Sequence, residues 1–119
     1  IMGRALPTRN ALLTAGMELI DRGVGMVVIS MGGDGALFVT QDARLHAHGV
    51  RVPVGSTVGA GDSMTASVAF DLERGLPLAE IARNAVAVSA ANVMCSGTQP
   101  AEREVIAGLI DKVEIETLP

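Results

Sequence analysis

The feature that most constrains the fold is residues 56–64, STVGAGDSM, in which small residues lead directly into a helical pattern. Gly59 and Gly61 can adopt positive φ, and without a Cβ they let a ligand approach the backbone closely. The first N–H groups of a helix have no intrahelical partner, and together with the helix dipole they attract an anion. The stretch therefore predicts a loop that enters the N-terminus of a helix and binds an anion there.

The carboxylate of Asp62 stands at this expected anion site, where it would repel a ligand that is only an anion. Its position is explained if it accepts a proton from a hydroxyl group that attacks a phosphoryl group. A glycine-rich turn in which Asp62 only caps the following helix would have the same sequence. Short motifs carry this ambiguity, so the spacing alone leaves both interpretations open.

Four segments are expected to be helical from the 3.6-residue period of their apolar residues and from their boundary residues. Three of them cover about 9–22, 60–74 and 78–95, and the fourth has Pro100 in its first turn and Thr98 as its N-cap. The third is rich in Ala and Val and is apolar on most sides, so we expect it to be buried.

Strands are expected over 26–30 and 36–40, joined by a glycine-rich turn, and over 44–54, which holds one or two strands with Gly49 between them. The first is an unbroken apolar and β-branched run, which is typical of a strand covered on both faces. Strands followed by helices, with a buried run among them, predict a layered α/β architecture.

The composition excludes several classes of protein. The chain has 119 residues, enough for one domain, and a net charge of −4 without a basic run, which argues against a nucleic-acid partner. It does not argue against ATP, which backbone N–H groups and magnesium can hold. Phe38 and Phe70 are the only aromatic residues apart from histidine, so the core is expected to be aliphatic.

Neither a membrane segment nor a disulfide is expected. No apolar run approaches the ~18 residues of a membrane span, and no signal peptide is visible, so a cytoplasmic protein is predicted. Cys95 is the only cysteine, which excludes an intrachain disulfide and suggests a small buried residue.

His46 and His48 lie two residues apart and would share one face of a strand. A metal-binding pair is conceivable, but no third ligand is close in the sequence. We therefore expect two solvent-exposed strand residues and no metal site. The acidic residues near the C-terminus are expected to be solvated; they are Glu102, Glu104, Glu114 and Glu116.

Two motifs carry a family resemblance. Residues 57–63, TVGAGDS, resemble the second signature of the ribokinase-like (PfkB) carbohydrate kinases, and with Ser56 they resemble the 1-phosphofructokinase and tagatose-6-phosphate kinase branch. Residues 27–37, VVISMGGDGAL, resemble the strand and nucleotide loop of the family, Ser-x-Gly-x-x-Gly. The resemblance extends over nearly the whole chain but matches only the C-terminal part of a usual member.

The resemblance implies a role for each matched position near the glycine-rich loop. Asp62 would be the general base, and the N–H groups of Gly59, Ala60 and Gly61 would form an anion hole for the transferring phosphoryl group. Many family members have Asp where Ser56 stands, and in some it belongs to a monovalent-cation site, so Ser56 puts that cation in doubt.

The other matched positions would contact ATP. Ser30, Gly32 and Gly35 would lie against the nucleotide, although an ordinary tight turn between two strands would explain them too. Val86 and Ala90 lie one helical turn apart and would touch the adenine base, with plain core packing as the alternative. Asp34 is expected to face solvent.

The sequence thus predicts the C-terminal portion, residues 1–119, of a ribokinase-like sugar kinase. This portion would bind MgATP and supply the catalytic base, while the substrate and lid portion, with the acidic residues that organise Mg²⁺, would be absent. The expected reaction phosphorylates fructose 1-phosphate to fructose 1,6-bisphosphate. The alternatives are a kinase for tagatose 6-phosphate or an unphosphorylated sugar, and a nucleotide-binding module without catalysis. Alone, the chain is expected to be inactive and to be a homo-oligomer or a self-associating fragment.

Overall fold

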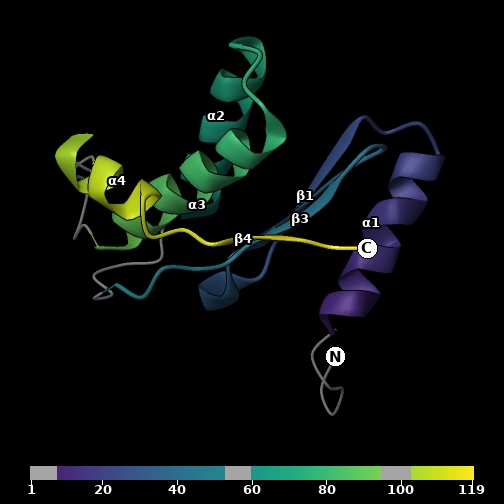
Figure 1. Cartoon of the computed structure of the whole chain (residues 1–119), viewed down its shortest axis with the longest axis horizontal. Coiled ribbons are helices and arrows are strands. Elements are labelled where there is room, and N and C mark those ends of the chain that lie inside the picture. The colour runs from purple at the N-terminus through teal and green to yellow at the C-terminus, as the bar shows by residue number, and fades with distance from the viewer. Residues whose placement is uncertain (1–7, 53–59, 95–102) are drawn as a thin grey trace.

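The computed structural model describes residues 8–52, 60–94 and 103–119 (Figure 1). Within these ranges the secondary structure alternates as the sequence patterns predict. In chain order the elements are α1 (Arg9–Asp21), β1 (Met26–Ser30), a 3₁₀ turn η1 (Gly32–Asp34), β2 (Ala36–Thr40), β3 (Arg44–Ala47), α2 (Ala60–Glu73), α3 (Leu78–Met94), α4 (Arg103–Ile110) and β4 (Ile115–Thr117).

The four strands form one antiparallel sheet in the order β1-β2-β3-β4. Because side chains alternate along a strand, each face of the sheet takes every second residue. One face packs on α1, and the other packs on α3, against which α2 and α4 lie (Figure 1). The predicted layered α/β architecture is therefore confirmed.

Helix α1 begins at a sequence-encoded cap. The hydroxyl of Thr8 accepts a hydrogen bond from the N–H of Ala11 at 3.1 Å, which satisfies one of the free N–H groups of the first turn. Gly16 is the buried residue of this helix, and a Cβ there would lie 3.4 Å from the side chains of both Ile29 and Val39. The small residue lets α1 pack closely on β1 and β2.

The core lies between the sheet and α3. It is built mainly from alanine and branched aliphatic residues, as predicted, with Phe38 fully buried at its centre. Phe70, in contrast, is 61% exposed on α2. Helix α3 buries seven residues and is the most buried helix of the described chain; they are Ile81, Ala82, Ala85, Val86, Ala87, Ala90 and Ala91.

The prediction that residues 26–30 are covered on both faces is wrong for this chain. All five residues of β1 are partly or largely exposed, and Val28 is 36% exposed. The reason is the position of β1 at the end of the sheet order: α1 packs on one of its faces, whereas α3 packs on β2, β3 and β4. An apolar run shows that a strand can be buried, but it does not show which element, if any, covers the strand in this chain.

The sequence patterns did not predict the C-terminal strand. They also predicted strand structure over 44–54, a longer range than the structure has. Only Arg44–Ala47 forms a strand, while residues 48–52 have none, and Pro53 lies outside the described residues. Strand β4 has three residues and pairs with β3, so its register depends on a segment about 70 residues away. The expected positions of Cys95, Thr98 and Pro100 also lie outside the described residues.

Among the helices that the structure describes, none has the length and apolar character to cross a membrane.

Candidate active site

The turn between β1 and β2 is held by its own backbone. The N–H of Met31 donates to the carbonyl of Gly35 at 2.8 Å, and the N–H of Gly35 donates to the carbonyl of Gly32 at 3.1 Å. Gly32 and Gly35 have φ of +59° and +92°, values that favour glycine. The spacing Ser-x-Gly-x-x-Gly is therefore explained locally by the geometry of this turn. Asp34 is exposed in it, as predicted.

Helix α2 begins at Ala60, so Ala60, Gly61 and Asp62 form its first turn. Their N–H groups belong to the set that lacks intrahelical acceptors, which is the geometry expected of an anion site. Gly59 lies outside the described residues. The expectation of positive φ at Gly61 is wrong, since this residue is helical and is not among the positive-φ glycines of the described chain. The space beside its Cα is open instead.

The position of α2 is fixed by a polar contact with α3. Asp71 is buried on α2 and accepts a hydrogen bond from the side-chain amide of Asn84 at 2.9 Å, and Arg74 lies 3.5 Å from the same carboxylate. A buried charge is stabilised only when such partners are present. This contact holds the helix that carries Asp62 against the helix that carries Val86 and Ala90.

One cavity of about 540 Å³ joins the two motifs. It is bordered by the η1 turn, by the first turn of α2 and by one side of α3. Every described residue predicted to contact ATP or to form the anion hole lines it; these are Ser30, Gly32, Gly35, Ala60, Gly61, Val86 and Ala90. Val86 and Ala90 also belong to the core. Contact with an adenine base and core packing are therefore compatible interpretations of this pair.

Asp62 lines a second cavity of about 440 Å³, on the flank of α2 that faces β1. Ser30, Gly61 and Met64 border both cavities. The first turn of α2 therefore stands between the two spaces, with backbone of Gly61 at both and the Asp62 carboxylate at the second.

Sequence reasoning missed several residues that line the first cavity. Ser89 and Val93 follow Val86 by three and seven residues, so the helical period that selected Ala90 was sufficient to find them. Arg51 and its neighbours 49–52 also line the cavity. Nothing local in the sequence marks Arg51, which is the one positively charged residue among the described residues that line this cavity.

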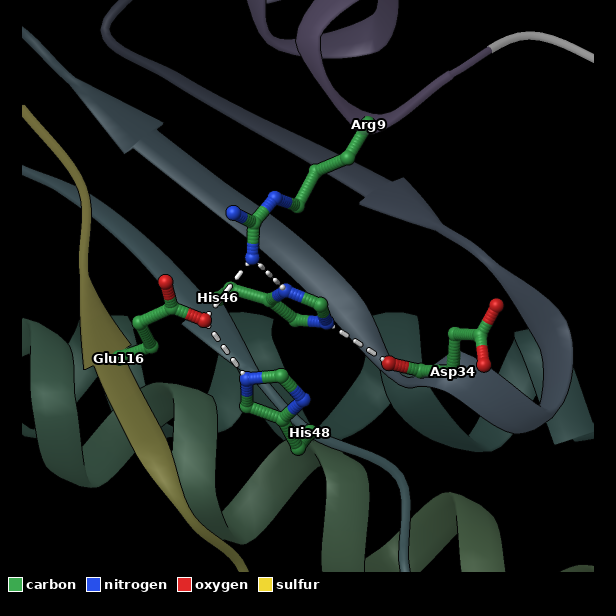
Figure 2. Close-up of polar contacts among 5 residues, drawn as sticks. All are labelled: Arg9, Asp34, His46, His48 and Glu116. Atoms are coloured by element: carbon green, nitrogen blue, oxygen red, sulfur yellow. Dashed lines mark hydrogen bonds and ion pairs between the residues drawn. The ribbon is translucent and has the colours of Figure 1, made fainter.

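The prediction of two solvent-exposed strand residues is wrong for His46, whereas the side chain of His48 is 40% exposed, just after the end of β3. His46 is only 5% exposed and is held from both sides: its Nε2 lies 2.8 Å from the carbonyl oxygen of Asp34, and its Nδ1 lies 3.1 Å from the guanidinium of Arg9 (Figure 2). His48 stacks on its ring with the centroids 3.8 Å apart. The exposed interpretation failed because α1, which covers this face, is distant in the sequence.

Glu116 was expected to be solvated but carries two contacts. Its carboxylate accepts hydrogen bonds from Arg9 at 2.8 Å and from His48 at 2.9 Å (Figure 2). The hydrogen bond from His48 and then that from Arg9 lower the pKa of the Glu116 carboxyl below its ordinary value of 4.5. The carboxylate therefore stays ionised at any pH near neutrality.

Residues 1–104 match the family model described as pfkB family carbohydrate kinase. The chain belongs to the pfkB family. Among pfkB relatives, it is 37% identical over 118 residues to the 1-phosphofructokinase of Rhodobacter capsulatus, an alignment that covers 99% of this chain and 37% of that protein. The chain thus spans little more than a third of the length of this relative. The resemblance stated from the two motifs is confirmed.

Solved structures give the same family and fold. Phosphofructokinase-2 from Escherichia coli, in complex with substrates and products, superposes with a TM-score of 0.83 at 29% identity, covering 92% of this chain and 36% of that one. The same protein is known in a tetrameric inhibited form. Ribokinase from Thermotoga maritima superposes with a TM-score of 0.72 at 27% identity, covering 82% and 34%. The ribokinase-like fold of this pfkB chain is thereby established over the part that it contains.

Proposed function

We propose that this chain supplies the nucleotide-binding and catalytic-base part of a kinase that phosphorylates fructose 1-phosphate to fructose 1,6-bisphosphate with MgATP. The observation that carries the proposal is that the first turn of α2 borders both cavities: Ala60 and Gly61 line the one that the nucleotide motif also lines, and Gly61 and Asp62 line the second. The family supports phosphoryl transfer, and the similarity to a 1-phosphofructokinase supports this acceptor.

The first cavity suits a nucleotide. Its volume lies in the range of small-molecule sites, roughly 300–1,000 Å³. The side formed by α3 is apolar at Val86, Ala90 and Val93, as the face of an adenine base requires. The opposite side offers backbone at Gly32 and Gly61 and the positive charge of Arg51, which suits phosphates. Phosphates are held well by backbone N–H groups at a helix N-terminus.

Asp62 would act from the side opposite the nucleotide. A sugar hydroxyl that reaches the second cavity near Ser30 and Asp62 would give its proton to the Asp62 carboxylate as its oxygen attacks the γ-phosphorus. The bond from the γ-phosphorus to the β–γ bridging oxygen would break at the same time, and ADP would leave. The N–H groups of Ala60 and Gly61 would stabilise the charge on the transferring oxygens. Mg²⁺ bound to ATP would supply additional charge neutralisation at the phosphates. Because the transition state is loose, positioning and electrostatics provide most of the rate acceleration.

A chimera tests the activity. The 119 residues replace the matching segment of the Rhodobacter capsulatus enzyme, which provides the remaining two thirds of a complete kinase. ADP release is then measured with fructose 1-phosphate, tagatose 6-phosphate and unphosphorylated fructose. We expect turnover with fructose 1-phosphate to exceed that with the other two. Because the Rhodobacter part supplies the substrate portion, turnover itself tests the nucleotide and base roles of the 119 residues, and the choice of sugar does not. A folded chimera that binds ATP and turns over none of the sugars would instead support the nucleotide-binding module.

The nucleotide site is tested on the chain itself by titration with ATP. Gly61→Val places a branched side chain in the open space at both cavities and is expected to weaken ATP binding at least tenfold. Gly108→Val is the matched control, because Gly108 is also helical and faces open space but lines neither cavity. Equal ATP affinities of the two variants would show that residues 60 and 61 form only a helix start.

A further inference from the structure

His46, His48 and Glu116 converge on the face of the sheet that α1 covers (Figure 2). His46 belongs to β3, His48 follows its end, and Glu116 belongs to the neighbouring strand β4. One ring nitrogen of each histidine and a carboxylate oxygen of Glu116 lie within 4.8 Å of one another. None of the three residues lines either cavity of the candidate active site.

The contacts of His46 determine its protonation. A guanidinium only donates hydrogen bonds, so Nδ1 of His46 must accept from Arg9 and carries a lone pair. A carbonyl only accepts, so Nε2 carries the proton and donates to Asp34. A metal-binding histidine is typically oriented in this way, with the second nitrogen donating to a carbonyl or a carboxylate. The lone pair of Nδ1 therefore already points toward the cluster before a metal ion binds.

Arg9 shows that the cluster already holds a cation. The same nitrogen of its guanidinium lies 3.1 Å from Nδ1 of His46 and 2.8 Å from Oε1 of Glu116. His48 approaches the same carboxylate oxygen through Nε2 at 2.9 Å. Two imidazoles and an ionised carboxylate thus surround a point that a positive group occupies.

We propose that His46, His48 and Glu116 bind a transition-metal ion of the Zn²⁺ class in place of the Arg9 guanidinium. Two imidazoles and one carboxylate suit Zn²⁺, whereas Mg²⁺ prefers oxygen ligands alone. Three protein ligands leave the fourth tetrahedral position for water. The ligands are Nδ1 of His46, Nε2 of His48 and a carboxylate oxygen of Glu116. The proton on Nε2 of His48 passes to solvent while Nδ1 of the same ring takes one up, so that the imidazole stays neutral.

The rearrangement that binding requires is small. With bonds of about 2.1 Å, tetrahedral ligands lie about 3.4 Å apart. The ligand atoms of the cluster all lie within 4.8 Å of one another, so the widest separation must close by little more than ~1 Å, while Nε2 of His48 and Oε1 of Glu116, now 2.9 Å apart, must move slightly apart. The side chains of His48 and Glu116 are 40% and 44% exposed and have room to move, while buried His46 stays fixed. Arg9 is also partly exposed. Releasing such an ion pair costs at most about fivefold in metal affinity.

Zinc titration against a chromophoric chelator tests the proposal, on the 119-residue chain without a polyhistidine tag and with Cys95→Ser, which removes the only thiol. One Zn²⁺ per chain is expected, unaffected by millimolar Mg²⁺. His48→Gln and Glu116→Gln should each weaken binding by at least the 10–100-fold typical of losing a supporting residue. Glu114→Gln, an exposed neighbour, is the matched control and should bind zinc like the parent. Arg9→Met should bind up to about fivefold more tightly, because the competing cation is gone.

Nitrogen NMR of the imidazoles provides an assay that needs no variant. The chain has two histidines, so their signals are separable without ambiguity, and zinc should shift Nδ1 of one ring and Nε2 of the other. Absence of zinc binding, binding that leaves both rings unshifted, or weaker binding in Arg9→Met would each overturn the proposal.

Discussion

Gly35 packs against the carbonyl oxygen of Ala47 so closely that a Cβ at position 35 would collide with it. Gly35 also has φ +92° and ψ −134°, a region nearly closed to residues with a side chain. We expect Gly35→Ala to lower the free energy of unfolding by about 2 kcal/mol or more, from backbone strain and collision together. Urea unfolding followed by circular dichroism measures it.

Gly33→Ala is the control for this prediction. Gly33 lies in the same turn, has no positive φ and faces open space. Its substitution should change stability by less than about 1 kcal/mol. If the two variants were equally stable, the close approach of the η1 turn to β3 would not constrain the loop.

Glu116 predicts a pH dependence of stability. Hydrogen bonds from His48 and Arg9 hold its pKa in the folded chain below 4.5, so its stabilising effect is complete above the unfolded pKa and is lost as the pH falls through the lower folded pKa. We expect the difference in urea midpoint between the chain and Glu116→Gln to be constant above about pH 5.5 and to vanish at acid pH. The effect is small because the carboxylate is exposed.

The same titration of Glu114→Gln separates this effect from general acid sensitivity. Glu114 is exposed and lies two residues before Glu116. Its variant should follow the parent chain at every pH. A difference for Glu116→Gln that persisted unchanged into acid would show that the two hydrogen bonds do not set its ionisation.

One edge of β1 has no partner strand among residues 8–52, 60–94 and 103–119, and from this we predict that the chain self-associates. Val28 is 36% exposed on this strand, and unpaired strand edges form hydrogen bonds with other chains. Light scattering of the chain should show species larger than a monomer, and Val28→Lys should reduce their mean mass. Leu19→Lys introduces the same charge at an exposed position of α1 and should leave the mass unchanged. A parent chain that stays monomeric would contradict this.

Local patterns were sufficient for the elements and for much of the candidate site. The period and the boundary residues placed α1, β1, β2, α2 and α3 within one or two residues of their observed ends. The residues expected around ATP line one cavity because their motifs are tied to turns and helix starts that short-range geometry determines. Their roles in binding and catalysis stay predictions until they are measured.

What the sequence could not provide depends on contacts between distant segments. The pairing of β4 with β3 and the burial of His46 beneath Arg9 join residues 37 to about 110 positions apart. Arg51 reaches the cavity for the same reason. The exposure of β1 was missed because an apolar run indicates a suitable surface but not the partner that covers it.

The role of Asp62 is tested by Asp62→Asn in the chimera. Asp62 is the third residue of α2. Asparagine has the same shape there and loses only the favourable interaction of a negative charge with the helix N-terminus, but it cannot accept a proton as a base does. If Asp62 is the base, turnover should fall by roughly 10² or more while ATP affinity stays nearly unchanged. Steady-state kinetics and ATP titration measure the two quantities separately.

This substitution also decides between the two interpretations that the sequence leaves open. A carboxylate that only stabilises the first turn of α2 could be replaced by asparagine with little effect on turnover, so turnover near that of the parent chimera would remove Asp62 from the mechanism. Asp42→Asn is the control for the change in charge, because Asp42 is exposed and lines neither cavity. A large loss confined to Asp62→Asn therefore assigns the effect to proton transfer, since the variant keeps the shape of the side chain.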